Sequence, residues 1–177
     1  MNISKIFGLG VSKYELDFLD VDLDEDCPLY IDPFLIANSN NKWAIEADRV
    51  IKSFFNEFKV TMKNGDYEKA KALFVYMEEP KDNCLGICSQ GTTNGHGLGE
   101  MDAEKIVEKI IESNAIEREL VNNIEDIVIF VEDIDKDKLS DMCTNLLRYK
   151  LIQYTQEQCA LWNIDMERYW KINFINS

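Results

Sequence analysis

Hydrophobic and polar positions alternate along residues 14–24, and the alternation changes phase once. The apolar residues are Tyr14, Leu16 and Phe18 before the change and Leu19, Val21 and Leu23 after it. A period of two is typical of a strand with one buried face, and a shift of one residue indicates a bulge or a bend. We therefore expect a bent N-terminal strand in this part of the chain.

A second candidate strand lies in the sequence DIVIFVED, residues 126–133, where five apolar residues stand between acidic ones. A short, continuous apolar run is typical of a strand buried on both faces of a sheet. Residues 167–175 at the end of the chain are also expected to be extended. Between the two candidate strands, Asp32 precedes Pro33, and proline favours the first position of a helix. We expect a short helix to begin at Pro33.

Apolar residues recur at helical spacing in four longer segments. These are residues 40–62, 67–79, 101–114 and 136–162. Asn40 or Asn41 can cap the first helix, and Asp102 can cap the third. The sequence KNGD separates the first two segments, which predicts an antiparallel helical hairpin. The last segment predicts one long helix, or two helices that meet near Tyr149.

These elements together predict an α/β or α+β fold. A mixed sheet would contain the bent N-terminal strand and the central buried strand, with at least four amphipathic helices packed against it. The length of 177 residues fits a single globular domain, 1–177, which can also be the N-terminal part of a longer protein. The residues expected in the core are Leu16, Phe18, Val21, Ile31, Val128, Phe130, Leu146 and Leu147.

The composition is that of an ordinary globular protein with a strongly acidic charge balance. Apolar residues make up 46% and charged residues 29%, while the net charge is −14. Such a chain repels phosphate backbones, so nucleic-acid binding by this chain alone is not expected, whereas a basic protein partner or bound divalent cations suit it. No apolar run approaches the ~20 residues of a membrane span. The first residues also lack the features of a signal peptide, which predicts a cytoplasmic protein with reduced cysteines.

A glycine-rich segment, residues 86–99, runs directly into the third predicted helix and contains the only histidine. Glycine allows the backbone to approach a bound group, and helix N-terminal amides attract anions, although the spacing matches no phosphate-binding fingerprint. A mobile loop, an anion site and a partner-binding loop all remain open. The ligand-binding candidates are Gly91, Thr92, Gly95, His96 and Gly97.

The same segment also suggests a zinc site. Cys84, Cys88 and His96 would be ligands, with Cys27 as a distant fourth, but the spacing is not that of a standard zinc knuckle. A nucleophilic pair of a cysteine with His96 is conceivable, although no neighbouring residue indicates an activated thiol.

Four acidic residues form a second candidate site. Asp32 follows residues 29–31, which we expect to be extended as a further strand, and Glu132 and Asp133 end the candidate strand of residues 126–133. Asp141 lies on the helix after them. Converging carboxylates at strand ends can hold Mg²⁺ or Mn²⁺, the arrangement that metal-dependent phosphoryl hydrolysis needs. Asp32, Glu132 and Asp141 would then be the catalytic residues of a phosphodiesterase or nuclease. The acid-x-lysine pattern that commonly accompanies a nuclease strand is absent.

The long C-terminal helix carries a polar stripe that forms a third candidate. Asp141 and Asn145 stand four residues apart, and Gln156 lies in an amide-rich run farther on. A solvated helix face explains these residues, and a hydrogen-bonding face for a ligand or partner is the alternative.

Three segments carry a resemblance to a group of bacterial proteins. PLYIDPFLI, the glycine-rich segment and VEDIDKDKLSDMCTNLLRYKLIQYTQEQC are similar to the N-terminal part of proteins associated with mobile elements and phage-defence neighbourhoods. The resemblance singles out the residues Asp32, Gly91, Gly97, Asp141, Asn145 and Gln156.

The leading hypothesis is a non-enzymatic binding or regulatory domain of a phage-defence or mobile-element system. It would recognise a protein partner or small ligand through the glycine-rich segment and the 138–162 helix, without a cofactor, and a homo-oligomer is compatible with it. The alternative hypothesis is the metal-dependent phosphodiesterase.

Overall fold

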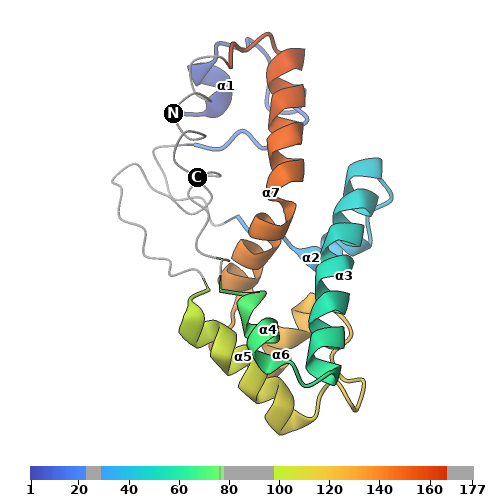
Figure 1. Ribbon diagram of the computed structural model, residues 1–177. Helices are drawn as coiled ribbons and strands as arrows, with labels where there is room; N and C mark the ends of the chain where they lie inside the picture. Colours follow the sequence, from blue (N-terminus) through green and yellow to red (C-terminus); the bar gives the residue numbers. More distant parts are fainter. Residues whose placement is uncertain (23–28, 76, 78–97, 167–177) are drawn as a thin grey trace.

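The computed structural model describes residues 1–22, 29–75, 77 and 98–166, and this part of the chain is helical (Figure 1). The elements are α1 (Ile3–Ile6), α2 (Pro33–Ala37), α3 (Lys42–Lys63), α4 (Tyr67–Ala72), α5 (Glu100–Ser113), the 3₁₀ turn η1 (Ile124–Asp126), α6 (Ile127–Phe130) and α7 (Lys136–Leu161). The described residues contain no strand and only one isolated bridge, between Asn2 and Asp22. The prediction of an α/β or α+β fold with a mixed sheet is therefore wrong. The extended segment expected at 167–175 lies outside the described residues.

The expected N-terminal strand is an irregular segment that packs against α1. Asp20 accepts hydrogen bonds from the backbone N–H of Ser4 at 2.8 Å and from its hydroxyl at 2.7 Å. Tyr14, at the start of the alternating pattern, is 87% exposed. Asp20 of this pattern bonds to a residue of α1 and Glu15 bonds to the nearby Ser12, so the alternation does not reflect the two faces of a sheet.

The apolar run at 127–131 forms a helical turn instead of a buried strand. Asp126 accepts hydrogen bonds from the backbone N–H groups of Asn122 and Asn123, at 2.8 and 2.9 Å, and these bonds hold the first turn of η1 in place. Ile129, in the middle of the run, is 77% exposed, which a doubly buried strand would not allow. The buried residues of this region are Val121, Ile124, Ile127, Val131 and Ile134. Their spacing of three and four residues is helical, and that signal extends beyond the run itself.

The predicted hairpin of α3 and α4 is present. Asn41 caps α3, because its side chain accepts a hydrogen bond from the backbone N–H of Ala44 at 2.7 Å. The turn between the helices includes Gly65, whose φ of +74° lies in the left-handed region that glycine adopts without strain. α4 ends at Ala72, earlier than the helical spacing predicts.

An ion pair links the N-terminal ends of the helices α5 and α7. The N-cap of α5 is Gly99 and not Asp102, which is the third residue of the helix; the Asp102 carboxylate accepts a hydrogen bond from the backbone N–H of Gly99 at 3.2 Å. The same carboxylate pairs with Lys138 of α7 at 2.9 Å. α7 is one continuous helix of 26 residues and does not break near Tyr149.

One hydrophobic cluster connects α3, α4, α5, α6 and α7. Phe74, just after α4, contacts Phe54 and Phe58 of α3 edge to face, with ring centroids 5.3 and 5.1 Å apart. The largest fully buried side chains are Phe58, Phe74, Leu98, Ile106, Ile110, Ile124, Ile127, Ile134, Met142 and Leu147. Of the residues expected in the core, Leu147 is fully buried, Ile31, Val128, Phe130 and Leu146 pack against the cluster partly buried, and Leu16, Phe18 and Val21 are half-buried outside it.

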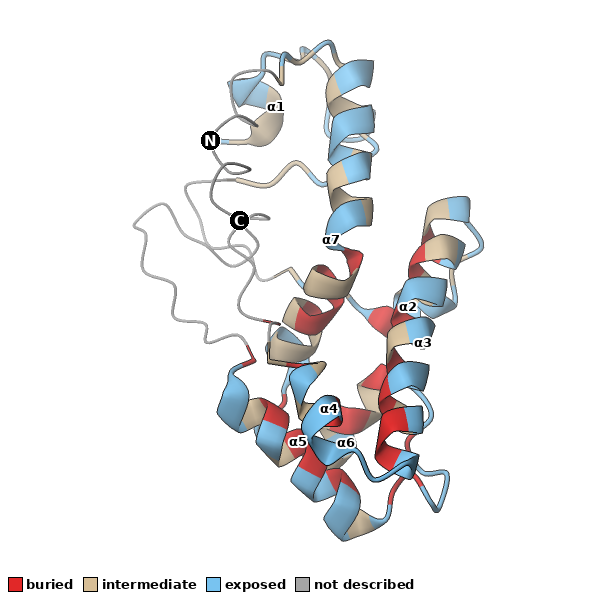
Figure 2. Cartoon of the chain, in the orientation of Figure 1, coloured by how far each residue is buried: buried red, intermediate tan, exposed pale blue. Residues whose placement is uncertain are grey.

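Buried residues gather at one end of the molecule (Figure 2). α3, α4, α5, α6 and the N-terminal half of α7 contain most of them, whereas the C-terminal half of α7 extends away towards α1 (Figures 1 and 2). Tyr154 of that half donates a hydrogen bond to the backbone carbonyl of Asp17. None of the described helices combines the length and the apolar character that a membrane span requires.

Candidate functional site

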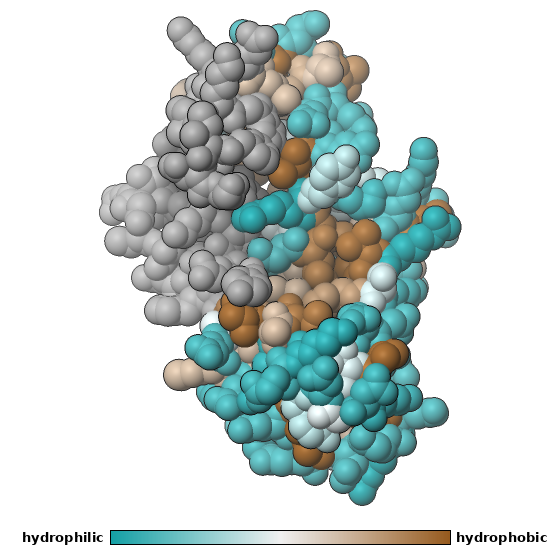
Figure 3. Space-filling model, in the orientation of Figure 1, coloured by the Kyte–Doolittle hydropathy of each residue, from teal (hydrophilic) through white to brown (hydrophobic). Residues whose placement is uncertain are grey.

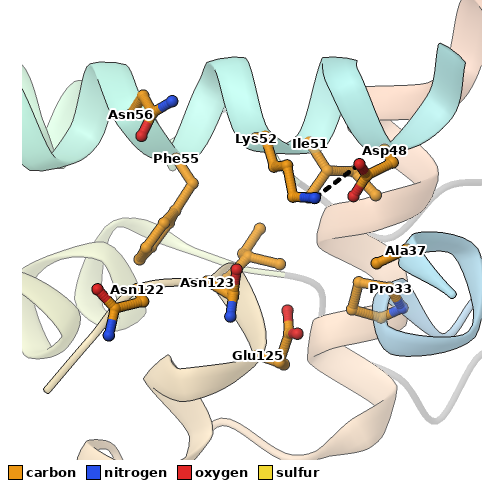
Figure 4. Close-up of a pocket in the computed structure, with 11 residues that line it drawn as sticks. Pro33, Ala37, Asp48, Ile51, Lys52, Phe55, Asn56, Asn122, Asn123 and Glu125 are labelled. Atoms are coloured by element: carbon orange, nitrogen blue, oxygen red, sulfur yellow. Dashed lines mark hydrogen bonds and ion pairs between the residues drawn. The ribbon is translucent and has the colours of Figure 1, made fainter. Parts of the chain in front are cut away.

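A small pocket lies where α2, α3 and the chain around η1 meet (Figure 4). It is lined by Pro33, Ala37, Asp48, Ile51, Lys52, Phe55, Asn56, Asn122, Asn123, Ile124 and Glu125. Its volume is about 30 Å³. One water molecule needs roughly 10–15 Å³ of such space, and pockets for drug-sized ligands measure roughly 300–1,000 Å³. This pocket therefore suits a single small chemical group and excludes a whole nucleotide.

The spacing of residues along α3 places one face of the helix over the pocket. Asp48, Ile51, Lys52, Phe55 and Asn56 recur at intervals of three and four residues, so their side chains share that face. Figure 4 shows these side chains on α3 opposite those of the η1 region.

α2 closes the pocket from a second direction. Asp32 caps this short helix by accepting hydrogen bonds from the backbone N–H groups of Phe34 at 2.9 Å and Leu35 at 3.4 Å. The extended segment before α2 is fixed to α7, because Ser140 accepts a hydrogen bond from the backbone N–H of Ile31 at 2.8 Å. Pro33 and Ala37 then stand four residues apart and form an apolar wall.

Of the two carboxylates that line the pocket, Asp48 has a cationic partner and Glu125 has none among the described residues. Lys52 pairs with Asp48 along α3, with 2.7 Å between the ammonium nitrogen and a carboxylate oxygen. Glu125 forms an ion pair with none of the described cations. Burial raises the pKa of Glu125, and the negative charges of Asp126, Asp32 and Asp48 raise it further, although the backbone N–H of Glu125 itself acts in the opposite direction.

The thiol of Cys143 on α7 experiences the same negative charges. Burial raises its pKa to about 12, and Glu125 and Asp32 contribute to the increase. A thiol with such a pKa stays protonated at neutral pH, so Cys143 is a core residue and not a nucleophile.

The four acidic residues of the metal hypothesis hold different structural positions. Asp32 caps α2, while Glu132 and Asp133 lie in the connection between α6 and α7. Asp133 is paired with Lys105, whose hydrogen bond and positive charge lower the pKa of the Asp133 carboxyl. Asp141 lies half-buried on α7. Within 1–22, 29–75, 77 and 98–166, no group of three or more His, Cys, Asp or Glu side chains is placed to hold a metal ion.

The remaining residues singled out in the sequence are only partly within the described structure. Asn145 donates a side-chain hydrogen bond to the backbone carbonyl of Asp141 at 2.9 Å, and Gln156 is exposed on the outer half of α7. Residues outside the described part are Gly91, Thr92, Gly95, His96 and Gly97 of the glycine-rich segment and Cys27, Cys84 and Cys88 of the zinc hypothesis.

The sequence analysis did not single out the polar residues of the pocket. Asp48 and Asn56 lie among the many polar residues of a predicted amphipathic helix, and nothing in the sequence distinguishes them from the others. Asn122, Asn123 and Glu125 precede a run that was interpreted as a strand. The signal that could have identified them is Asp126, three residues after Asn123, which marks a helix start.

The described part of the chain is thus a helical domain with a small polar pocket between three of its elements. The chain belongs to DUF8370, a family defined as a domain of unknown function, whose model matches residues 8–176. No curated protein and no solved structure matches the chain. The link to phage-defence or mobile-element neighbourhoods therefore stays a prediction from the resemblance of the three segments.

Proposed function

We propose that this chain is a non-enzymatic binding or regulatory domain that recognises a protein partner. The observation that carries the proposal is the position of Phe34 and Leu35 on α2, which are 60% and 65% exposed, directly beside the pocket residue Pro33. Adjacent apolar side chains next to a small polar cavity are typical of a surface where a few residues of a partner anchor an interface.

The surface around α2 supports the same proposal. Figure 3 shows apolar side chains gathered between α3 and α7, where α2 lies in Figure 1, with polar side chains around them. An apolar centre with a polar surround is the usual anatomy of a protein interface. The small volume of the pocket also favours one side chain of a macromolecule over a free metabolite.

The sequence suggests two further regions that contact the partner in this proposal, the 138–162 helix and the glycine-rich segment. Tyr149 of α7 lies within the expected contact region, residues 138–162, and is 78% exposed. The glycine-rich segment remains a proposed contact region. From the resemblance alone, we propose that the partner belongs to a bacterial phage-defence or mobile-element system.

Partner capture with matched variants tests the proposal. Phe34→Ser combined with Leu35→Ser should abolish retention of a specific partner. Met101→Ser, which changes a residue that is 73% exposed on α5, should preserve it. Retention that is equal for all three proteins would contradict recognition through α2.

A thermal-shift panel separates this function from metal-dependent chemistry. A ligand at about 100 times its Kd stabilises the native state by ~2.7 kcal/mol, which raises the melting temperature measurably. We expect Mg²⁺, Mn²⁺ and nucleotides to leave the melting temperature unchanged. A saturable increase with Mn²⁺ would overturn the proposal in favour of a metal-dependent enzyme.

A further inference from the structure

We infer that the pocket between α2, α3 and η1 receives the ammonium group of a lysine side chain on a basic segment of the partner protein. This inference rests on the proposed function, because it names the chemistry of the partner at the proposed binding surface.

The charge of the surroundings favours a cation. Asp32, Asp48, Glu125 and Asp126 contribute four carboxylates in and around the pocket. Two ammonium groups stand against them: Lys52 pairs with Asp48, and Lys59 donates a hydrogen bond to the backbone carbonyl of Asn122 at 3.3 Å. The whole chain carries a net charge of −14. Such a field attracts basic segments from a distance and repels acidic ones.

Glu125 is the group that a bound cation would complement. Asp48 is paired with Lys52, Asp126 accepts two backbone hydrogen bonds, and Asp32 caps α2. The half-buried carboxylate of Glu125 instead faces other negative charges, and its pKa is raised. An ammonium group at this position would relieve that repulsion and form a partly buried ion pair.

The size and the lining of the pocket favour lysine over arginine. An ammonium group is a compact charge with three donors, whereas a guanidinium group is a larger planar fork. A volume of about 30 Å³ suits the former. Asn56, Asn122 and Asn123 also line the pocket. Figure 4 shows Asn123 beside Glu125, where its amide oxygen can accept a hydrogen bond from an ammonium group. The apolar walls from Pro33, Phe55 and Ile124 can cover the methylene stem of the incoming lysine.

Lys52 acts as an internal competitor in this arrangement. Its side chain is 54% exposed, so it can leave Asp48 for solvent when another ammonium group enters. Removing the Lys52 charge should therefore strengthen binding, whereas removing the Glu125 charge should weaken it.

The test uses n-butylammonium chloride as a mimic of the lysine side chain, titrated into the full chain at low ionic strength. Binding is followed by NMR through the side-chain NH₂ signals of Asn56, Asn122 and Asn123. We expect saturable shifts of these signals with a Kd on the order of 1–10 mM, which is typical of a fragment of this size. Glu125→Gln should weaken binding at least about five-fold, and Lys52→Gln should strengthen it about two-fold to five-fold.

Glu132→Gln is the matched control, because it removes one exposed carboxylate that does not line the pocket. This variant should bind n-butylammonium like the wild type. Unshifted asparagine signals, or equal binding by Glu125→Gln and the wild type, would overturn the inference. Tighter binding of n-propylguanidinium would overturn the assignment to lysine. Any of these results would refute the lysine site. If partner capture still depended on Phe34 and Leu35, the proposed function would remain supported.

Discussion

The backbone N–H of Ile31 donates a hydrogen bond to the hydroxyl of Ser140, 2.8 Å away, across 109 positions of the sequence. This bond fixes the segment before α2 to α7 and so determines where α2 meets the pocket. Ser140 is 5% exposed, so water cannot easily replace it.

Ser140→Ala should destabilise the protein, because it leaves the N–H of Ile31 without its acceptor. An unsatisfied polar group of this kind costs roughly 1–3 kcal/mol. Urea unfolding followed by circular dichroism gives the change in the free energy of unfolding. Ser113→Ala is the control, since the Ser113 hydroxyl bonds only to carbonyls of its own helix end. Equal stabilities of the two variants would contradict a role for Ser140 in holding α2.

Phe74→Ala and Phe34→Ala remove the same atoms from opposite environments. Phe74 is fully buried among the phenylalanine rings of α3, and its loss should cost about 3–5 kcal/mol of the free energy of unfolding. Phe34 is 60% exposed, and its loss should change stability by less than about 1 kcal/mol. Denaturant unfolding of both variants tests this difference. A comparable loss in Phe34→Ala would show that α2 is a core element and not a binding surface.

Substitutions of Asp32 distinguish a cap from a metal ligand. Asp32→Ala should cost about 1 kcal/mol, because the N–H groups of Phe34 and Leu35 lose their acceptor, whereas Asp32→Asn should retain most of the stability. The melting temperature in EDTA and in Mn²⁺ is the measurement. If Mn²⁺ stabilised the wild type and not Asp32→Asn, the capping role would not account for this residue.

The stability of Glu125→Gln relative to the wild type should depend on pH. Since the folded state raises the pKa of Glu125 above its ordinary value of 4.5, the wild type gains most from Glu125 while the carboxyl is protonated. That contribution is lost as the pH rises through the raised pKa, because the ionised carboxylate is then repelled by the negative charges of Asp126, Asp32 and Asp48. Lys52 does not offset this repulsion fully, since its ammonium group is paired with Asp48. At pH 7 the variant should be more stable than the wild type by roughly 0.5 kcal/mol. Below about pH 4 the two should converge. Unfolding curves at several pH values test this, and a constant difference would contradict it.

Local signals in the sequence predicted the positions of the helices well. They did not predict correctly which segments would form strands and pair with each other. Asn41 caps α3, Pro33 stands in the first turn of α2, and Asp102 bonds back to the residue before α5. These signals are local, because they depend on residues within three or four positions of the helix start. The alternation at 14–22 was misleading, since a period of two also arises when acidic residues such as Asp20 bond to a neighbouring helix. A run of five apolar residues is ambiguous by itself, and the buried positions Val121 and Ile134 outside it show the helical spacing.

The candidate site was less accessible to sequence reasoning than the helices. The pocket combines residues of α2, α3 and the chain around η1, and these span 92 positions from Pro33 to Glu125, so no local motif contains them. Its only marked local feature, the face of α3 from Asp48 to Asn56, has the spacing of any amphipathic helix. Phe34 and Leu35 belong to a hydrophobic segment of the sequence, and only the packing of α2 in the structure shows that both side chains are exposed.

The unequal burial along α7 divides this single helix into two parts that should open at different rates. Its buried residues all lie between Ser140 and Leu147, although the helix continues to Leu161. Hydrogen exchange of the backbone amides should therefore require nearly global unfolding in the inner part. In the outer part it should require only a local opening of lower free energy. The N-terminal segment, held there through Tyr154 and Asp17, would be released by that opening while the pocket and the aromatic core stay closed.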